Sequence, residues 1–589
     1  MAKIEYTPKQ KEVLEDKSNN LLVSASAGSG KTATIIQKIF NLIAEDKIDI
    51  SEMLVITFTE AASLEMKIRL KDKLFSGCES DKSLNEQIEK LPTSDISTIH
   101  GFCSKMLRKY FFKLDLNPNF LVLNENDSKF LKANALDKII KRYSNKQDDE
   151  FVFLTNIFGG GRNFANFKSN ILNFYDFLCA VEDKNDFRKN ILTSCYEVDL
   201  NKNKACKILN EYIKSTNYYI NCSLDNYLQE ADIYKADFYK DFIAKIKVQL
   251  SSIDYKKSFI ENRKALLSVE LERSPTKKFK DGNEDFKEIF KPFYKEVQSL
   301  INELKGIVLS KTEEELSIDL ENASKILNKF SEVESEFEKE YILLKQKRNA
   351  LDFGDLEEKF LELLNFDDIK QSISSTYKYI FVDEYQDINS VQELILSKLL
   401  NNNKMVMVGD IKQSIYGFRN SSPNIFVNKS LLYKENKAEG TLINLNENFR
   451  SNPDILNFVN SIFNKCMFAD FGGVDYKVSG KLSGMTKYKN VNDIPTVSLS
   501  VVSSKNEEGE DKPEEEVFDE IYSVIEDKNL YSKKLTAARK EAMIIAEQIL
   551  AMVGKKSYYD AKEEVAKTIS YGDIAIHDCF FWLFKVISN

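Results

Sequence analysis

Residues Asn20–Ala33 read NLLVSASAGSGKTA, a mostly apolar run that passes through a glycine-rich turn into an amphipathic segment. The run NLLVSAS is short and nearly uninterrupted, as in a strand that is buried on both faces. The segment KTATIIQKIFNLIAED that follows the turn predicts a helix. A second pair of the same kind, MLVITFT and EAASLEMKIRLKDKLF, comes next. Strands of this type separated by helices predict an α/β fold around a parallel sheet.

The turn has the composition of a phosphate-binding loop. Gly28 and Gly30 allow backbone N–H groups to curl around phosphate oxygens, and the following helix N-terminus adds partial positive charge. Lys31 would neutralise the β and γ phosphates of ATP, and the Thr32 hydroxyl would bind Mg²⁺. The pattern G-x-x-x-x-G-K-[ST] has Ala25 at its first position, a departure from the strict form. A chance match in a loop is the alternative, and the flanking strand and helix argue against it.

We therefore predict a P-loop NTPase that uses ATP and Mg²⁺. The residues predicted to surround the nucleotide are Ala25, Ser26, Ala27, Gly28, Ser29, Gly30, Lys31 and Thr32.

The stretch YIFVDEYQD, Tyr379–Asp387, places two adjacent carboxylates at the end of another apolar strand. Asp383 suits the acid that holds the metal, and Glu384 can orient and deprotonate an attacking water. The alternative is a strand end followed by a polar helix start, with Asp387 as a cap. Beside a phosphate-binding loop, the catalytic interpretation is favoured.

Further candidates lie near the N-terminus and after the run NKMVMVGD. The amide of Gln10 could pair with one edge of a purine. Gln413 follows the carboxyl end of a predicted strand, where it could sense a γ-phosphate. Tyr416, Phe418 and Arg419 could stack on bases, although core packing is an equally ordinary role for the two aromatic rings.

Composition limits the class of protein. The 589 residues are 43% hydrophobic and 30% charged, which is typical of an ordered, soluble chain of several domains. We expect a cytoplasmic protein without a membrane segment, because neither a long apolar span nor a signal-peptide core is present. Eight scattered cysteines and two histidines argue against zinc, iron–sulfur and disulfide frameworks. The net charge of −9 gives no overall signal for nucleic acid, but a local groove could still bind it.

The sequence pattern changes between residues 115 and 345, where long charged stretches with helical periodicity, such as DFYKDFIAKIKVQL, predominate. We predict that this helical insertion interrupts a first α/β domain made of residues 1–114 and 346–440. A second α/β unit is expected over 441–576, beginning at GTLINLNENFRS. SPTKKFKDGNED and NEEGEDKPEEEVFDE are interpreted as surface loops.

Six motifs together are far more specific than any one: AGSGKT, VITFTEAASLEMKIRL, ISTIHGFC, FVDEYQD, VGDIKQSIYGFR and LNENFRS. In this order they resemble the motifs of superfamily 1 helicases of the UvrD/RecB type. Within that group, STIHGFCSKMLRKYFFKLDLNPNF and NENFRSNPDILNFVNSIF are similar to the A-subunit family of bacterial AddAB (RexAB) helicase–nucleases. The resemblance covers residues 1 to about 576.

The resemblance implies an ATP-dependent 3′–5′ DNA helicase subunit of a helicase–nuclease that acts in double-strand break repair and recombination. The implied architecture is a RecA-like motor domain, the helical insertion and an incomplete second RecA-like domain. Single- or double-stranded DNA and a B subunit are the implied partners, in a bacterial cytoplasm. Two other functions stay open: a stand-alone repair helicase of the UvrD/PcrA type, or a nucleotide-dependent DNA-binding module with little hydrolysis.

The resemblance also assigns roles. Gln10 would read adenine, and Gln413 and Arg450 would contact the γ-phosphate from the two sides of a cleft. The implied catalytic residues are Lys31, Asp383, Glu384, Gln413 and Arg450. The implied DNA-binding residues are Thr57, Phe58, Thr59, His100, Tyr416, Phe418 and Arg419. For His100, a hydrogen-bonded place in the core remains the alternative.

Residues 577–589 depart from the family pattern, because the only tryptophan and one of the two histidines fall there. We expect a frameshift, an early stop or a misassembled gene near Ile576. The late helicase motifs and the nuclease acids would then be missing, and the chain would bind nucleotide better than it hydrolyses it.

Overall fold

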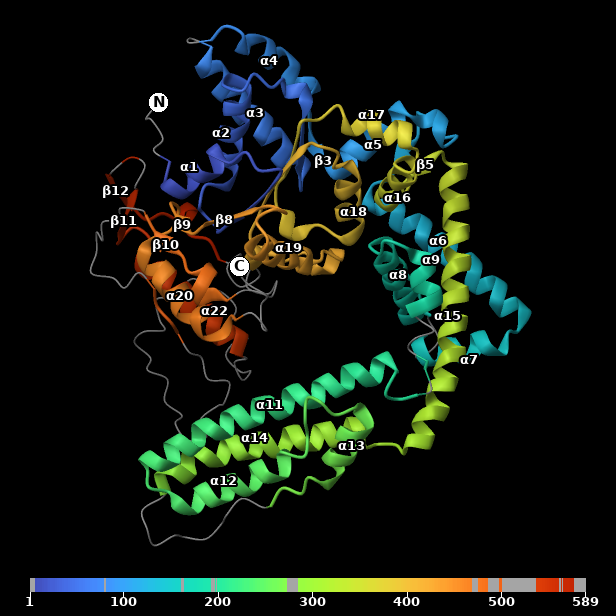
Figure 1. Cartoon of the computed structure of the whole chain (residues 1–589), viewed down its shortest axis with the longest axis vertical. Helices are drawn as coiled ribbons and strands as arrows, with labels where there is room; N and C mark the ends of the chain where they lie inside the picture. The colour runs from blue at the N-terminus through green and yellow to red at the C-terminus, as the bar shows by residue number, and fades with distance from the viewer. Residues whose placement is uncertain are drawn as a thin grey trace, which may run out of the picture. The chain divides into compact units, whose positions relative to one another are not determined.

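A computed structural model describes residues 6–78, 81–159, 164–191, 196–197, 199–272, 284–468, 475–485, 497–500, 537–560, 563 and 565–576. The chain divides into two compact units, Met1–Phe102 with Phe366–Asn589, and Cys103–Asn365 (Figure 1). The predicted loop at 506–520, most of the one at 274–285 and the predicted aberrant tail at 577–589 lie outside the described residues.

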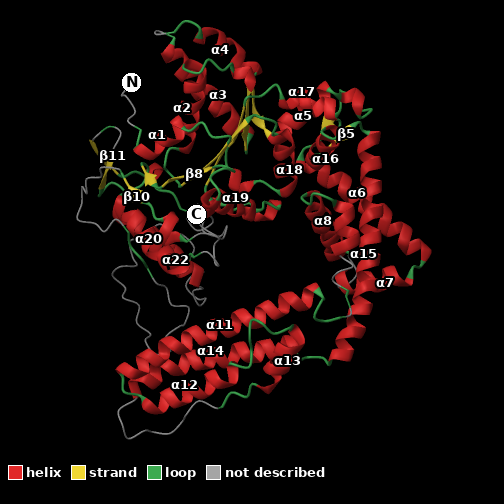
Figure 2. Ribbon diagram, viewed as in Figure 1, coloured by secondary structure: helices red, strands yellow, loops and turns green. Residues whose placement is uncertain are grey.

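The first unit is built on a six-stranded sheet in the order β3-β2-β6-β7-β1-β8. Strands are drawn in yellow in Figure 2. Every neighbouring pair of strands in the sheet is parallel, so the predicted parallel α/β fold is confirmed. The strands are β1 Asn20–Ala25, β2 Met53–Thr57, β3 Asp95–Thr98, β6 Tyr379–Val382, β7 Lys404–Gly409 and β8 Thr441–Leu445.

Helices bury both faces of this sheet. Leu21 and Val23 share a core with α2 and α3, whereas Leu22 points to the opposite face because successive side chains of a strand alternate. Leu22 is also fully buried, and α19 contacts β1 and β8. The helices of this unit before the last strand are α1 Pro8–Glu15, α2 Lys31–Ala44, α3 Glu60–Gly77, α4 Leu84–Lys90, α5 Ile99–Lys109 (which runs into the second unit), α17 Asp367–Ser374, α18 Ser390–Leu399 and α19 Pro423–Glu435.

Strand β8 corrects one predicted boundary. We expected residue 441 to open a second α/β unit, but Thr441–Leu445 pairs with β1 as the sixth strand of the first sheet. The apolar pattern of residues 441–445 predicts a strand but does not say which strand it pairs with. In the structure, Ile443 and Leu445 lie in the core formed with α2 and α3. The elements after it are β9 Glu447–Asn448, α20 Pro453–Cys466, β10 Ser483–Gly484, α22 Ala537–Met552, β11 Ser557–Asp560 and β12 Val565–Thr568. Strands β9 and β10 form one pair, and β11 and β12 form another.

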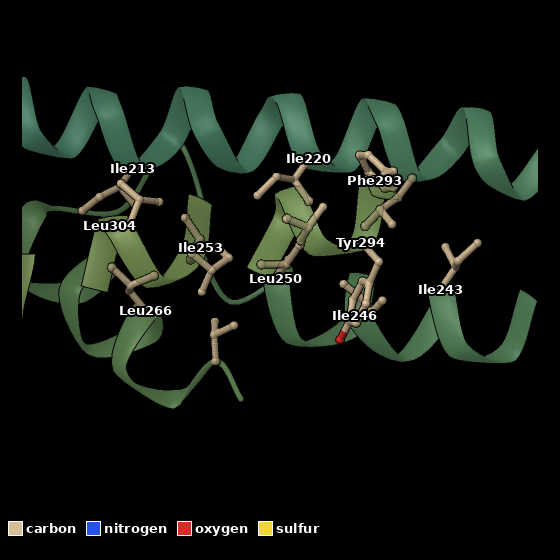
Figure 3. Close-up of a cluster of buried hydrophobic side chains, with 14 of the residues drawn as sticks. Ile213, Ile220, Ile243, Ile246, Leu250, Ile253, Leu266, Phe293, Tyr294 and Leu304 are labelled. Atoms are coloured by element: carbon tan, nitrogen blue, oxygen red, sulfur yellow. The ribbon is translucent and has the colours of Figure 1, made fainter. Parts of the chain in front are cut away.

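The second unit is helical, as the charged stretches predict. One of its cores lies among α11, α12, α13 and α14 and includes Ile213, Ile246 and Tyr294; Ile246 lies beside Tyr294, and Ile213 lies beside Leu304 (Figure 3). A second core joins α6, α7 and α8 to α15. The elements are β4 Leu121–Val122, α6 Glu125–Lys146, α7 Asp149–Gly159, α8 Ala165–Cys179, α9 Lys184–Asp186, α11 Lys204–Ile233, α12 Asp237–Leu250, α13 Phe259–Ser268, α14 Glu284–Val308, α15 Glu313–Lys347, β5 Ala350–Leu351 and α16 Phe353–Leu363.

Across the described part of the chain, no helix has both the length and the apolar character needed to cross a membrane.

Candidate functional site

The candidate residues lie along one edge of the six-stranded sheet. All strands are parallel, so their carboxyl ends share an edge, which is where ligands bind in open α/β sheets. The glycine-rich turn follows β1, and Asp383 and Glu384 follow β6. The other candidates at this edge are Thr57–Thr59 at the end of β2, His100 after β3, Gln413–Arg419 after β7 and Arg450 after β8.

The glycine-rich turn needs its glycines. Gly28 has φ 71° and Gly30 has φ 81°, left-handed values that disfavour residues with a Cβ atom. A Cβ atom on Gly28 would lie 2.7 Å from Nδ2 of Asn448 and 2.9 Å from Cβ of Arg450. Gly30 is the N-cap of α2, so Lys31 and Thr32 occupy the first turn of that helix. The backbone of this turn therefore ends at a helix N-terminus, which favours negative charge.

Lys31 reaches the acids that follow β6, although β7 lies between their two strands. Its Nζ lies 3.1 Å from Oε2 of Glu384, and the two side chains are 11% and 35% exposed. Glu384 itself has φ 51°, an uncommon value for a residue other than glycine. Such strained residues occur often at functional sites.

Asp383 is half-buried beside Glu384. Its Oδ1 accepts a hydrogen bond from the backbone N–H of Glu384 at 3.0 Å, and its own N–H donates to the carbonyl of Ile56. Burial, with the nearby charge of Glu384, raises the pKa of Asp383 to about 6. Its side chain is therefore a weaker acid than an exposed aspartate.

Gln386 joins these acids to the next strand, and the sequence reasoning missed it. The side chain is buried, and its Nε2 donates to Oε2 of Glu384 at 2.8 Å and to Oδ2 of Asp387 at 3.0 Å. Its Oε1 accepts from the backbone N–H of Asp410 at 2.9 Å. Glutamine is so common on exposed helices that only its place within YIFVDEYQD could have singled it out.

Gln413 is held by Asp410 in the turn η6, Ile411–Gln413. Its Nε2 donates to Oδ2 of Asp410 at 2.7 Å. The buried Asp410 also pairs with Lys412 at 2.7 Å, and Nζ of Lys412 donates to the Ser26 hydroxyl at 3.2 Å. Lys412 is thus a second lysine at the glycine-rich turn, and the sequence reasoning missed it as well.

Gln10 touches the glycine-rich turn from α1. Its Nε2 donates to the carbonyl of Ser29 at 3.0 Å, and its Oε1 accepts from the backbone N–H of Thr7 at 3.0 Å. An amide has two hydrogens and two lone pairs, so one hydrogen and one lone pair of Gln10 remain for a ligand. Helix α1 is held by Lys38, whose Nζ donates to the carbonyls of Val13 and Asp16, and burial lowers the pKa of this lysine to about 8.

Arg450 lies beside the same turn. The Asn448 side chain donates to the carbonyl of Ala27 at 2.7 Å, and the Phe449 N–H donates to the carbonyl of Gly28 at 2.9 Å. Oδ1 of Asn448 accepts from the backbone N–H of Arg450 at 2.9 Å. These bonds place the segment that carries Arg450 against the predicted phosphate-binding loop.

The candidate DNA contacts fall into two groups. Phe58, Tyr416 and Phe418 form a row of rings, with centroids 4.6 Å and 5.7 Å apart, and Phe418 is 77% exposed. Thr57 and Thr59 have local partners instead, because the Thr57 hydroxyl bonds the carbonyl of Thr59 and the Thr59 hydroxyl caps α3.

The two remaining predicted DNA contacts belong to neither group. His100 is half-buried in the first turn of α5. Arg419 ends the turn η7, Gly417–Arg419, and its side chain lies outside what the structure describes.

The fold and this edge define the class: an α/β protein with a parallel sheet covered on both faces and a polar site at the carboxyl ends of its strands. The chain belongs to the UvrD/REP helicase family, since the UvrD/REP helicase N-terminal domain matches residues 6–434.

Curated relatives are similar over nearly the whole chain. The A subunit of the ATP-dependent helicase/nuclease of Staphylococcus haemolyticus is 29% identical over an alignment of 598 positions. This alignment covers 97% of this chain and 46% of the relative. The proteins of the same name from Lactobacillus johnsonii and Natranaerobius thermophilus are 30% and 29% identical over 97% of this chain, and 48% and 46% of their lengths are covered. The chain thus spans about half the length of the curated relatives it matches.

Proposed function

We propose that this chain is the motor part of an ATP-dependent DNA helicase that works within a helicase–nuclease complex in double-strand break repair. The contact of Lys31 with Glu384 carries the proposal, because it brings a lysine at a helix N-terminus to an acid 353 residues away. The relatives' names support membership of such a complex. A B subunit, 3′–5′ movement and a place in the bacterial cytoplasm belong to the proposal.

In this proposal the glycine-rich turn is a P-loop and the sheet is that of a RecA-like domain. Backbone N–H groups at the start of α2 bind the phosphates of ATP, and Lys31 neutralises the β and γ groups. A bound triphosphate would compete with Glu384 for Lys31 and free this carboxylate to take a proton from water. The left-handed backbone of Glu384 orients its side chain for that role.

Magnesium fits the residues at this edge. Thr32 offers a hydroxyl in the first turn of α2, and Asp383 offers a carboxylate at the end of β6. Within the described residues no group of three or more His, Cys, Asp or Glu side chains could hold a metal. Two protein oxygens suit Mg²⁺, which is usually bound by one or two protein ligands together with substrate phosphates. Bound there, it would neutralise charge on the phosphates.

Gln413 and Arg450 would contact the γ-phosphate, and Gln10 would contact adenine through the free positions of its amide. Arg450 is supported by its place next to Gly28. Contact of Gln413 with the γ-phosphate can shift the loop that carries Tyr416, because the two residues are three positions apart. Closure of a cleft between this domain and a second motor domain, expected to follow β8, would convert hydrolysis into movement.

The row of rings Phe58, Tyr416 and Phe418 would hold single-stranded DNA. Stacking on aromatic rings accepts every base and is worth roughly 1–3 kcal/mol per base, so it suits movement without base preference. Thr57, Thr59, His100 and Arg419 complete the proposed track.

Hydrolysis of ATP stimulated by single-stranded DNA tests this function. Lys31→Ala and Glu384→Gln should each lower the stimulated rate about 100-fold or more, because each removes a group that acts on the transferring phosphate. Lys71→Ala, on an exposed face of α3, is the control and should keep the rate. The binding-module function would be supported instead if the chain bound DNA in a nucleotide-dependent way and showed no hydrolysis that Lys31→Ala or Glu384→Gln abolishes.

A further inference from the structure

We infer that Gln386 is a positioning residue for Glu384, and that its amide ties this acid to the strand end that holds Gln413. The inference rests on the proposed function, because it assigns Gln386 a part in the same hydrolysis. Gln386 itself would touch neither nucleotide nor metal.

The amide of Gln386 donates both of its hydrogens and accepts one bond, and these partners allow one orientation. Its NH₂ group faces two carboxylates, those of Glu384 and Asp387, while its oxygen faces the N–H of Asp410. A flipped amide would set its oxygen against two acids and its hydrogens against a donor. The side chain is 1% exposed, so water cannot replace these partners.

The Glu384 carboxylate needs a hydrogen-bond partner that keeps it in position through the proposed cycle. Lys31 also binds its carboxylate, and in the proposed cycle the phosphates would compete for that lysine. Gln386 is neutral and buried, so it can keep its bond to Oε2 while Lys31 changes partner. It also stays clear of the water that the other carboxylate oxygen would activate.

The same amide continues a chain of hydrogen bonds to Gln413. Gln413 donates to the Asp410 carboxylate at 2.7 Å, the Asp410 N–H donates to Gln386 at 2.9 Å, and Gln386 donates to Glu384 at 2.8 Å. Gly409 has no room for a side chain, because Oε1 of Gln386 occupies that space. A displacement of Gln413 on contact with phosphate therefore reaches Glu384 through a single, tightly packed amide.

Gln386→Met removes these bonds and keeps the length of the side chain. Gln87→Met is a matched control, because Nε2 of Gln87 donates to Asp49 at 3.0 Å and its Oε1 accepts from the Ile50 N–H at 2.8 Å, away from the site. With the full chain in excess over radiolabelled ATP, Gln386→Met should lower the maximal single-turnover rate about 10- to 100-fold and leave its dependence on protein concentration unchanged. Gln87→Met should keep the rate, and equal losses in both variants would overturn the inference.

Two results separate this inference from the proposed function. If Glu384→Gln keeps the wild-type rate, the proposed function fails. If Glu384→Gln abolishes hydrolysis while Gln386→Met keeps the wild-type rate, the positioning role alone is overturned.

A second measurement does not depend on hydrolysis. The melting-temperature shifts of Gln386→Met and Glu384→Ala should be non-additive in the double variant, because each removes the hydrogen bond between the two side chains. Additive shifts would overturn the inference.

Discussion

Asn448 donates a hydrogen bond from its side-chain amide to the carbonyl oxygen of Ala27 at 2.7 Å, so the segment after β8 supports the turn after β1. The other end of the amide accepts from the N–H groups of Arg450 and Ser451. Asn448 is 2% exposed. One buried side chain thus fixes both the glycine-rich turn and the proposed γ-phosphate arginine.

Asn448→Ala should destabilise the fold by about 1–3 kcal/mol, since buried N–H and C=O groups lose their partner. It should also weaken binding of a fluorescent ATP analogue. Asn262→Ala is the matched control, because Asn262 is a fully buried asparagine with several hydrogen bonds in the helical unit. That variant should melt early yet bind the nucleotide normally, and equal loss of binding in both would show that Asn448 acts only through stability.

Gly28→Ala should abolish nucleotide binding. The new methyl group meets Nδ2 of Asn448 at 2.7 Å, on top of the unfavourable left-handed φ of 71°. Gly554→Ala separates the two causes, because Gly554 has φ 70° with nothing within 4 Å of a Cβ atom. Urea unfolding should show a loss of about 1–2 kcal/mol for Gly554→Ala, from backbone strain alone, and a larger loss for Gly28→Ala. Equal losses would contradict the steric argument.

Asp383→Asn should stabilise the fold at neutral pH while it removes magnesium-dependent hydrolysis. The folded chain keeps the Asp383 proton up to a pKa of about 6, whereas the unfolded chain releases it near 3.8. The ionised side chain therefore costs about 2–3 kcal/mol above pH 6, and the cost fades as the pH falls from 6 toward 4.

Urea unfolding in magnesium-free buffer at about pH 7.5 and about pH 5 checks this sign. The stability gained by Asp383→Asn should shrink at the lower pH. Asp241→Asn, on an exposed face of α12, should change stability little at either pH. A gain that grows on acidification would refute the assignment.

Gln10→Ala should reduce the preference for ATP over GTP about 10-fold, because a glutamine amide that pairs with adenine contributes roughly 1–3 kcal/mol of discrimination. Competition between the two nucleotides for the wild-type and variant chains measures this ratio. Gln10 also bonds Thr7 and Ser29, so a purely structural loss would weaken binding of both nucleotides alike.

Tyr416→Ala should weaken binding of single-stranded oligonucleotides by about 1–3 kcal/mol, regardless of base sequence. Phe58→Ala should do the same, and the double variant should lose less than the sum because the two rings lie 4.6 Å apart. Phe75→Ala, a 71% exposed ring on α3, is the control and should bind normally. Fluorescence anisotropy with labelled homopolymers gives these affinities.

Local patterns predicted much of this molecule. The runs around Val23, Val55, Phe381 and Val406 became strands of one parallel sheet, and the stretch around Ile246 became a helix. Strand β3 was missed, since Asp95–Thr98 has a single strongly apolar residue. Gln386 and Lys412 were missed because both residue types are common on protein surfaces, and only their places within the motifs YIFVDEYQD and VGDIKQSIYGFR could have singled them out.

Sequence alone established most of the succession of strands and helices and the place of the glycine-rich turn, because periodicity and turn chemistry act over a few residues. Tertiary structure established that β8 pairs with β1, that Lys31 meets Glu384, and that Gln386 binds that acid and the Asp410 backbone. These relations depend on the order of strands in the sheet. Long-range packing and hydrogen bonding decide that order, because the strands have similar apolar patterns and local sequence does not distinguish their neighbours. The candidate residues were therefore identifiable one by one, whereas their arrangement as a site was not.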